Sequence, residues 1–158
     1  MGRLTGTHHG DAANALLRFY VEKAAELEDA GQYFMAAIAL AFGIETAILT
    51  YLLVEFGEDN GGELQIPNDV NFFNLIDAAN EIDVLSAPIN TPSHVRDDGQ
   101  RPKEVAKDIV DRIRRFRNLI HPAATLRQRY DPRTFTKKDL EEFKEMCESV
   151  MHSLLYYI

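Results

Sequence analysis

The stretch YFMAAIALAFGIETAILTYLLV, residues 33–54, decides the fold of this 158-residue chain. It carries a single charged side chain, Glu45, and is otherwise apolar on nearly every side. A helix of this composition either spans a membrane or forms the surrounded centre of a bundle. Glu45 would lie in the middle of a membrane span, and no Lys or Arg between Lys23 and Arg96 is present to set its orientation. We therefore expect the central helix of a bundle and no membrane partner.

Two features of this segment predict how neighbouring helices pack on it. Glu45 needs a partner, because a buried and unpaired carboxylate is costly, and arginine is the obvious candidate. Small side chains at four-residue steps make a smooth ridge, which another helix can approach closely; the ridge consists of Ala39, Gly43 and Ala47.

The fold class predicted for the whole chain is all-α. Apolar side chains recur at helical spacing nearly throughout, and no run alternates as a half-buried strand would. Caps, glycines and prolines delimit about five helices, which are expected at residues 11–30 (capped by Asp11), 32–56, 69–85 (capped by Asn68 or Asp69), 102–121 and 136–158 (opened by a Thr136–Asp139 capping box). The chain is therefore expected to be a single-domain helical bundle over residues 11–158, behind a flexible N-terminus at residues 1–10.

Three segments carry more specific expectations. In the third helix, Phe72 and Phe73 are both expected to face inward. The last helix has apolar side chains in alternating three- and four-residue steps, a packing seam of Leu140, Phe143, Cys147, Val150, Leu154 and Tyr157. Residues 86–101, SAPINTPSHVRDDGQR, are typical of a long loop, which is uncommon inside a compact domain. Such a loop is either disordered or a lid, here one that carries His94 and Arg96.

The sequence argues against metal, disulfide and nucleotide-loop chemistry. Cys147 is the single cysteine, which excludes an internal disulfide and, with no signal-peptide pattern at the start, favours a reducing, cytoplasmic setting. The histidines show no HxxxH pairing, and His8 and His9 are expected to belong to a frayed terminus. Gly61 and Gly62 lack the lysine context of a phosphate-binding loop. We therefore expect no metal and no cofactor.

The formal net charge of −8 hides an uneven distribution. Residues 1–100 hold 4 basic and 16 acidic side chains, residues 101–138 hold 12 and 4, and residues 139–158 hold 1 and 5. A basic segment of this kind creates a local positive field that attracts anions, whatever the total charge. The alternative is internal, with the basic helix pairing with acidic neighbours. Both interpretations remain open.

The basic segment contains RRFRNLIHP, residues 114–122. Pro122 disfavours α conformation at the residue before it, so the fourth helix should end at His121. At about 100° per residue from Ile113, one flank beside the core stripe collects Arg117, His121, Arg114 and Asn118, at about 40°, 80°, 100° and 140°. Arginine matches phosphate oxygens, and histidine titrates near neutrality. The flank predicts a phosphate site; the alternative is a solvated helix face.

The stretch FRNLIHP resembles the signature of the HEPN superfamily, helical domains in which an arginine, usually followed by a polar residue, precedes a histidine with four to six residues between them. The run AAIALAFGIETAIL is also similar to the early long helix of HEPN-like domains of unknown function, and the likeness in organisation covers residues 12–155. The resemblance implies a bundle that dimerises so that two arginine–histidine motifs face each other across a cleft. In active members these motifs cleave RNA without metal: histidine handles protons and arginine steadies the developing charge.

The spacing in this chain departs from that signature. Arg117, which precedes Asn118, has only three residues before His121. Arg114 has six and lies on the right face, but it is followed by Arg115. The resemblance therefore assigns the arginine role to Arg114 first and Arg117 second, the polar role to Asn118 and proton transfer to His121.

Two functions remain open at this point. The first is a HEPN-like homodimer that binds RNA or another phosphate ligand and cleaves RNA as a toxin-like or defence-associated ribonuclease, with a protein partner such as an antitoxin. The second is a catalytically inactive interaction module, in which the small-residue ridge and the terminal seam serve dimerisation or docking. In the second function, Arg114 and Arg117 pair with Glu45 and other acids, and no free cationic cleft remains.

Overall fold

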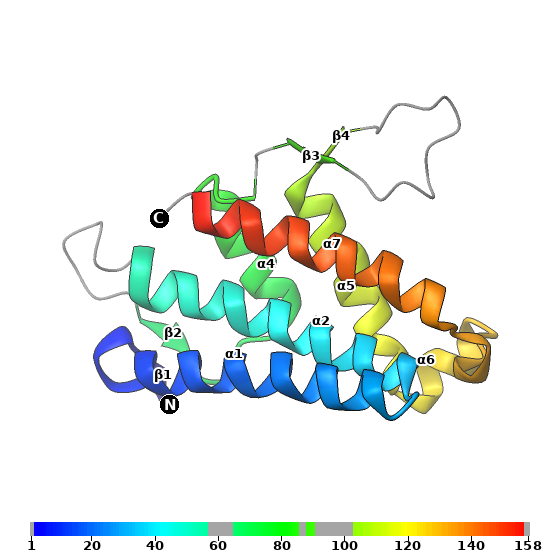
Figure 1. Ribbon diagram of the computed structural model, residues 1–158. Helices are drawn as coiled ribbons and strands as arrows, with labels where there is room; N and C mark the ends of the chain where they lie inside the picture. The colour runs from blue at the N-terminus through cyan, green and yellow to red at the C-terminus, as the bar shows by residue number, and fades with distance from the viewer. Residues whose placement is uncertain (1, 57–64, 86–87, 91–102, 157–158) are drawn as a thin grey trace.

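The computed structural model describes residues 2–56, 65–85, 88–90 and 103–156, and these form an all-α bundle, as expected (Figure 1). Its α-helices are α1 (Gly6–Asp29), α2 (Tyr33–Thr50), α4 (Phe72–Glu81), α5 (Ala106–Arg117), α6 (Pro122–Arg127) and α7 (Lys137–Tyr156). Helical turns of other types extend this set: the π-helix η1 (Tyr51–Phe56) and the 3-10 turns η3 (Asn118–Ile120) and η4 (Pro132–Thr134).

Two short strand pairs accompany the helices, and the sequence did not predict them. Strand β1 (Arg3–Leu4) pairs antiparallel with β2 (Ile66–Pro67), and β3 (Pro88–Asn90) pairs antiparallel with β4 (Lys103–Val105). Strands of two or three residues are too short to show alternation. The second pair corrects two predictions, because residues 88–90 form a strand inside the expected loop and the fourth helix begins at Ala106 instead of residue 102. The rest of that loop, with His94 and Arg96, lies outside the described residues.

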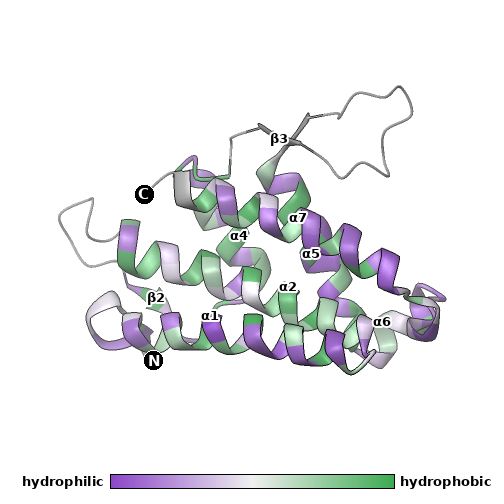
Figure 2. Ribbon diagram, in the orientation of Figure 1, coloured by the Kyte–Doolittle hydropathy of each residue, from purple (hydrophilic) through white to green (hydrophobic). Residues whose placement is uncertain are grey.

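Helix α2 lies at the centre of the bundle, as its composition predicts. It contacts α1, α4, α5 and α7, and Figure 2 shows that it is mostly hydrophobic along its length. Its buried threonine hydroxyls bond to its own backbone: Thr46 Oγ1 donates to the Phe42 carbonyl at 2.8 Å, and Thr50 Oγ1 donates to the Thr46 carbonyl at 2.7 Å. Among the described residues, Tyr33–Phe56 is the one helix long and apolar enough to cross a membrane, and 72% of its most apolar window is buried in the bundle.

The small-residue ridge of α2 is covered within the chain. Ala39 and Ala47 are buried, and a Cβ added at Gly43 would stand 3.7 Å from the Cβ of Tyr20 on α1. The Tyr20 ring stacks on Phe42, with ring centroids 5.5 Å apart. The predicted close approach of another helix is therefore confirmed, and that helix is α1.

The start of α1 differs from the prediction. Thr5, not Asp11, caps the helix: the Thr5 side chain accepts from the His8 N–H at 3.3 Å, and the Thr5 N–H donates to His9 Nδ1 at 2.9 Å. These reciprocal bonds act like a capping box. Because Arg3–Leu4 also pairs with β2, the predicted flexible N-terminus is replaced from residue 3 onward by a strand and the first turns of α1.

The predictions for α4 and α7 are mostly confirmed, but α4 ends at Glu81, four residues before the expected end. Asn71 caps α4 by accepting from the Asn74 N–H at 2.8 Å, two or three residues after the expected cap. Phe72 is fully buried, but Phe73 is 51% exposed and the inward prediction for it is wrong. At α7 the capping box is present: the Thr136 N–H donates to Asp139 Oδ2 at 2.9 Å, and the Asp139 N–H donates to Thr136 Oγ1 at 3.2 Å. Every described member of the seam is buried, and Tyr157 lies outside the described residues.

Two glycine substitutions test the packing of α1. At Gly6 an added Cβ would collide with the backbone carbonyl oxygen of Leu53, which cannot rotate away, so we expect Gly6→Ala to lower the free energy of unfolding by about 1–3 kcal/mol. At Gly43 an alanine has room, and replacing a helical glycine should raise stability by up to about 1 kcal/mol. Urea unfolding followed by circular dichroism measures both. Equal stability of the two variants would contradict the close approach of α1 to η1.

Candidate functional site

His121 stands at the junction of two helical segments. After α5 the chain tightens into the 3-10 turn η3, His121 adopts an extended backbone with φ −84° and ψ 124°, and Pro122 opens α6. Pro122 therefore ends the preceding segment as predicted. The His121 side chain is exposed, and within the described part of the chain its ring makes no hydrogen bond or ion pair. The ring is thus open to solvent.

Arg117 is not on an open flank. Its Nη1 donates to Glu45 Oε2 at 3.0 Å, and the two side chains are only 17% and 20% exposed. Its guanidinium carbon also lies 5.2 Å from the centroid of the Phe42 ring and 5.4 Å from that of Phe72. The arginine partner predicted for Glu45 is therefore present, and α2 and α4 enclose the cation.

Burial dominates the electrostatics of this ion pair. Burial raises the pKa of the Glu45 carboxyl above its ordinary value, and the Arg117 guanidinium lowers it in part. The Nε of Arg117 is buried without a hydrogen-bond partner among the described residues. Two faces of aromatic ring compensate for some of the lost hydration of the cation. If the Arg117 side chain turned away to bind another ligand, Glu45 would be left buried and unpaired, which is strongly unfavourable.

Arg114 is held by its own helix and by α4. Its Nε and Nη2 lie 3.0 Å and 2.9 Å from Asp111 Oδ1, and its guanidinium carbon lies 5.3 Å from the centroid of the Phe73 ring. Arg115 is more exposed and lies 3.8 Å from Asp111 Oδ2. Asp111 therefore serves two arginines, and the exposed ring of Phe73 has a cationic neighbour.

The predicted flank is thus only partly assembled. Arg114 and Arg117 are engaged by carboxylates and rings, Asn118 is half-buried in η3, and His121 is exposed. No interaction in the described residues joins either guanidinium to the His121 ring. The side of the helix was predicted from the residue angles, but the direction in which each long side chain reaches was not.

Sequence reasoning missed the residues that hold these arginines. The pairing of Asp111 with Arg114 could have been predicted, because Asp111 stands three residues before Arg114 and such pairs meet on a helix surface. Phe42 and Phe72 gave no local signal, since α2, α4 and α5 must pack before the rings can enclose Arg117.

Four exposed cations of the basic segment that lack a carboxylate partner in the described structure lie farther along the chain. Arg127, Arg129, Lys137 and Lys138 are exposed, and in the described structure none of them forms an ion pair. Arg133, between them, pairs with Asp131 at 3.0 Å, and this hydrogen bond lowers the pKa of Asp131. The open positive charge of the basic segment is therefore at α6 and the start of α7.

The described residues offer neither a metal cluster nor a reactive thiol. Among the described residues, no group of three or more His, Cys, Asp or Glu side chains is placed to hold a metal ion. Cys147 is buried in the α7 seam, and burial raises the pKa of its thiol far above the usual range. A thiol in that environment is a poor nucleophile at neutral pH.

Comparisons with protein-family models, with curated proteins and with solved structures found no match for this chain.

The raised pKa of Glu45 gives a pH-dependent prediction. The folded chain binds a proton at Glu45 more readily than the unfolded chain does, so this group favours folding most below pH 4.5, its ordinary pKa, and the contribution is lost as pH rises through the folded-state pKa. Urea titration measures the unfolding free energy of wild type and of Glu45→Gln at each pH. We expect the difference, wild type minus variant, to fall as pH rises from about 4.5 to 7. Glu22→Gln, on the exposed face of α1, controls for loss of one charge. A difference that grows with pH would refute the burial argument.

Proposed function

We propose that this chain is a helical interaction module whose arginine–histidine motif has a structural rather than a catalytic role. The observation that carries the proposal is the ion pair between Arg117 and Glu45, enclosed by Phe42 and Phe72. An arginine that stabilises a transition state must point at the developing charge. Here the guanidinium is already committed to the packing of α5 against α2 and α4.

The resemblance to HEPN domains is compatible with this proposal. A helical bundle around a long apolar helix is retained, while the arginines that the resemblance assigns to phosphate are engaged within the chain. The partner is proposed to be a protein in the cytoplasm, either a second copy or another chain. The surfaces first expected to dock it are occupied internally, because the Ala39–Gly43–Ala47 ridge is covered by α1 at Gly43 and the described α7 seam is core.

A second candidate function is the binding of RNA or another phosphate ligand without cleavage. The exposed cations Arg127, Arg129, Lys137 and Lys138, together with the open ring of His121, favour it. Contacts of this kind neutralise phosphates and release counterions, so such binding would weaken steeply with salt.

Cleavage of RNA in the presence of EDTA separates an interaction module from a ribonuclease. Labelled single-stranded and hairpin RNAs are incubated with wild-type protein and with His121→Ala, and products are resolved on denaturing gels. Because both arginines are engaged, we expect no product above buffer and no difference between the two proteins. Cleavage by wild type that disappears in His121→Ala would overturn the proposed function.

Binding of the same RNAs tests the second candidate. The doubly substituted chain Arg127→Gln/Arg129→Gln removes two exposed cations, and Arg115→Gln, which removes a cation already near Asp111, is the matched control. If phosphate binding occurs, the double variant should bind several-fold more weakly than the control at low salt, measured by fluorescence anisotropy. Equal affinities would reject α6 as a phosphate surface.

A further inference from the structure

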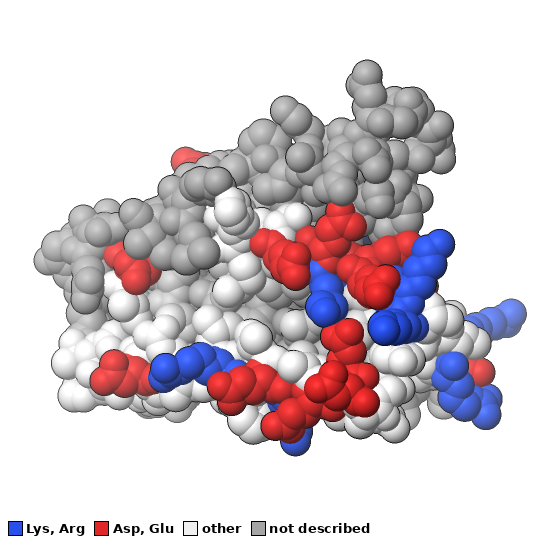
Figure 3. Space-filling model, viewed as in Figure 1, with Lys and Arg blue, Asp and Glu red and all other residues white. Residues whose placement is uncertain are grey.

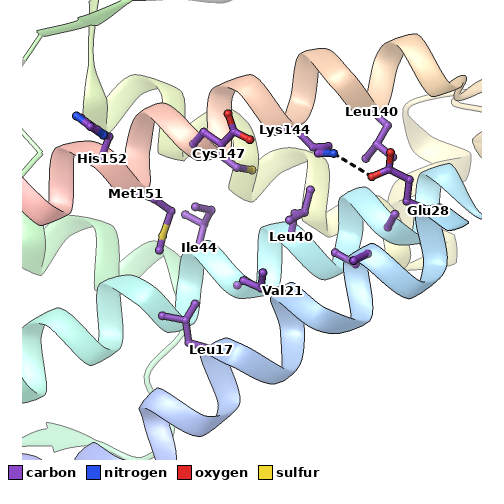
Figure 4. A pocket seen from close by; sticks show the side chains of 15 residues that line it. Leu17, Val21, Glu28, Leu40, Ile44, Leu140, Lys144, Cys147, Met151 and His152 are labelled. Carbon is purple, nitrogen blue, oxygen red and sulfur yellow. Dashed lines mark hydrogen bonds and ion pairs between the residues drawn. The ribbon is translucent and has the colours of Figure 1, made fainter.

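An apolar groove runs between α1 and α7, with α2 as its floor (Figure 4). Its cavity volume is about 510 Å³, and its apolar lining includes Leu17, Val21, Leu40, Ile44 and Met151. Val21 is 49% exposed although it is apolar. Exposed apolar surface collected in a concave site marks an interaction surface more often than scattered side chains do.

The groove has defined ends. At one end Lys144 on α7 reaches across to Glu28 on α1, with Nζ 3.0 Å from Oε1, and at the other end His152 lies beside Met151 (Figure 4). Leu17 and Glu28 are 11 residues apart on α1, so the lined length is about 16 Å, or three helical turns. The ion pair bridges the two banks without filling the apolar floor between them.

Acidic side chains border this groove on both banks, and Figure 3 shows them over α1 and α7, with a few basic side chains among them, on either side of a pale, uncharged strip. Glu28 and Glu148 line it directly. By angle around each helix axis, the exposed Glu22 and Asp29 on α1 and Glu141 on α7 flank the lining positions. The cations on the same faces are Arg18, Lys144 and, one turn beyond the groove, Lys137. Because Lys144 already pairs with Glu28, the banks carry a net negative charge.

We propose that this groove binds one amphipathic helix of a partner protein, about three turns long, with apolar side chains at i, i+4 and i+7 and with Lys or Arg on either side of them. The proposal rests on the proposed function and specifies its partner. A helix fits because its backbone groups, apart from those of its first and last turns, bond to one another, whereas an extended peptide would leave N–H and C=O groups unpaired against an apolar floor. Basic flanks fit because they meet the acidic banks.

A second copy of this chain does not fit the same groove face to face. A symmetric dimer brings the patch against its own equivalent, so one net negative surface would meet another. Like charges opposed in this way are unfavourable at an interface. The charge of the banks therefore favours a different chain with a basic helix.

The test uses two designed helical peptides of about 16 residues, one with Leu at the i, i+4, i+7 and i+11 positions and Lys beside them, and one with Glu in place of each Lys. Fluorescence anisotropy with the full chain measures binding at low salt. We expect the Lys peptide to bind about tenfold more tightly than the Glu peptide. Amide shifts in NMR spectra should change at Leu17, Leu40 and Met151.

Matched variants place the binding in the groove. Val21→Lys adds a cation to the groove and should weaken binding of the Lys peptide about tenfold. The control is Phe19→Lys, which changes an apolar side chain of similar exposure, 53%, on the other side of α1. This control should leave the affinity for the Lys peptide unchanged. Circular dichroism confirms that both variants are folded.

Several results would overturn the groove proposal: no binding of either peptide, equal binding of both, or an equal effect of the two variants. A wild-type dimer that Val21→Lys dissociates in light scattering would also overturn it, because the groove would then hold a second copy. The peptide results are independent of RNA cleavage. Failure of the groove proposal is thus distinguishable from failure of the proposed function.

Discussion

The ion pair between Glu45 and Arg117 is the constraint on which this bundle depends. Helix α2 is apolar apart from this one carboxylate, so the helices around it must supply a cation at that point. Arg117 supplies it from the end of α5, and Phe42 and Phe72 enclose the guanidinium from α2 and α4. The Arg117 side chain therefore links the positions of three helices. Little solvent reaches the pair, so water cannot readily replace either partner.

This constraint also limits what the neighbouring residues can do. Arg114, the first candidate for the arginine role that the resemblance implies, is shared between Asp111 and Phe73. Arg117, the second candidate, is held by Glu45. His121 remains exposed, but no interaction in the described residues joins its ring to Arg114 or Arg117, the two arginines expected to steady the charge of a phosphate transition state. Two features of the described structure are available to a partner, the α1–α7 groove and the exposed cations among residues 127–138, and they differ in chemistry.

The sequence predicted those features that depend on local pattern or on a strong energetic penalty. The central position of α2, the arginine partner of Glu45, the capping box at Thr136 and the stop at Pro122 all follow from such rules. It did not predict the cap at Thr5, because the choice between Thr5 and Asp11 depends on the His9 ring and on strand pairing with β2. Nor did it predict where the arginines point, since helical angles place a Cα and not the end of a long flexible side chain.

A double-mutant cycle between Glu45 and Arg117 tests the central claim most directly. The free energy of unfolding is measured at neutral pH for wild type, Glu45→Gln, Arg117→Met and the double variant, where methionine keeps an apolar stem and removes the charge. The enclosed ion pair predicts a coupling energy of at least about 1 kcal/mol, because each single variant leaves one buried charge unpaired. Additive effects, with a coupling energy within about 0.3 kcal/mol of zero, would show that the two side chains do not depend on each other and would contradict the account.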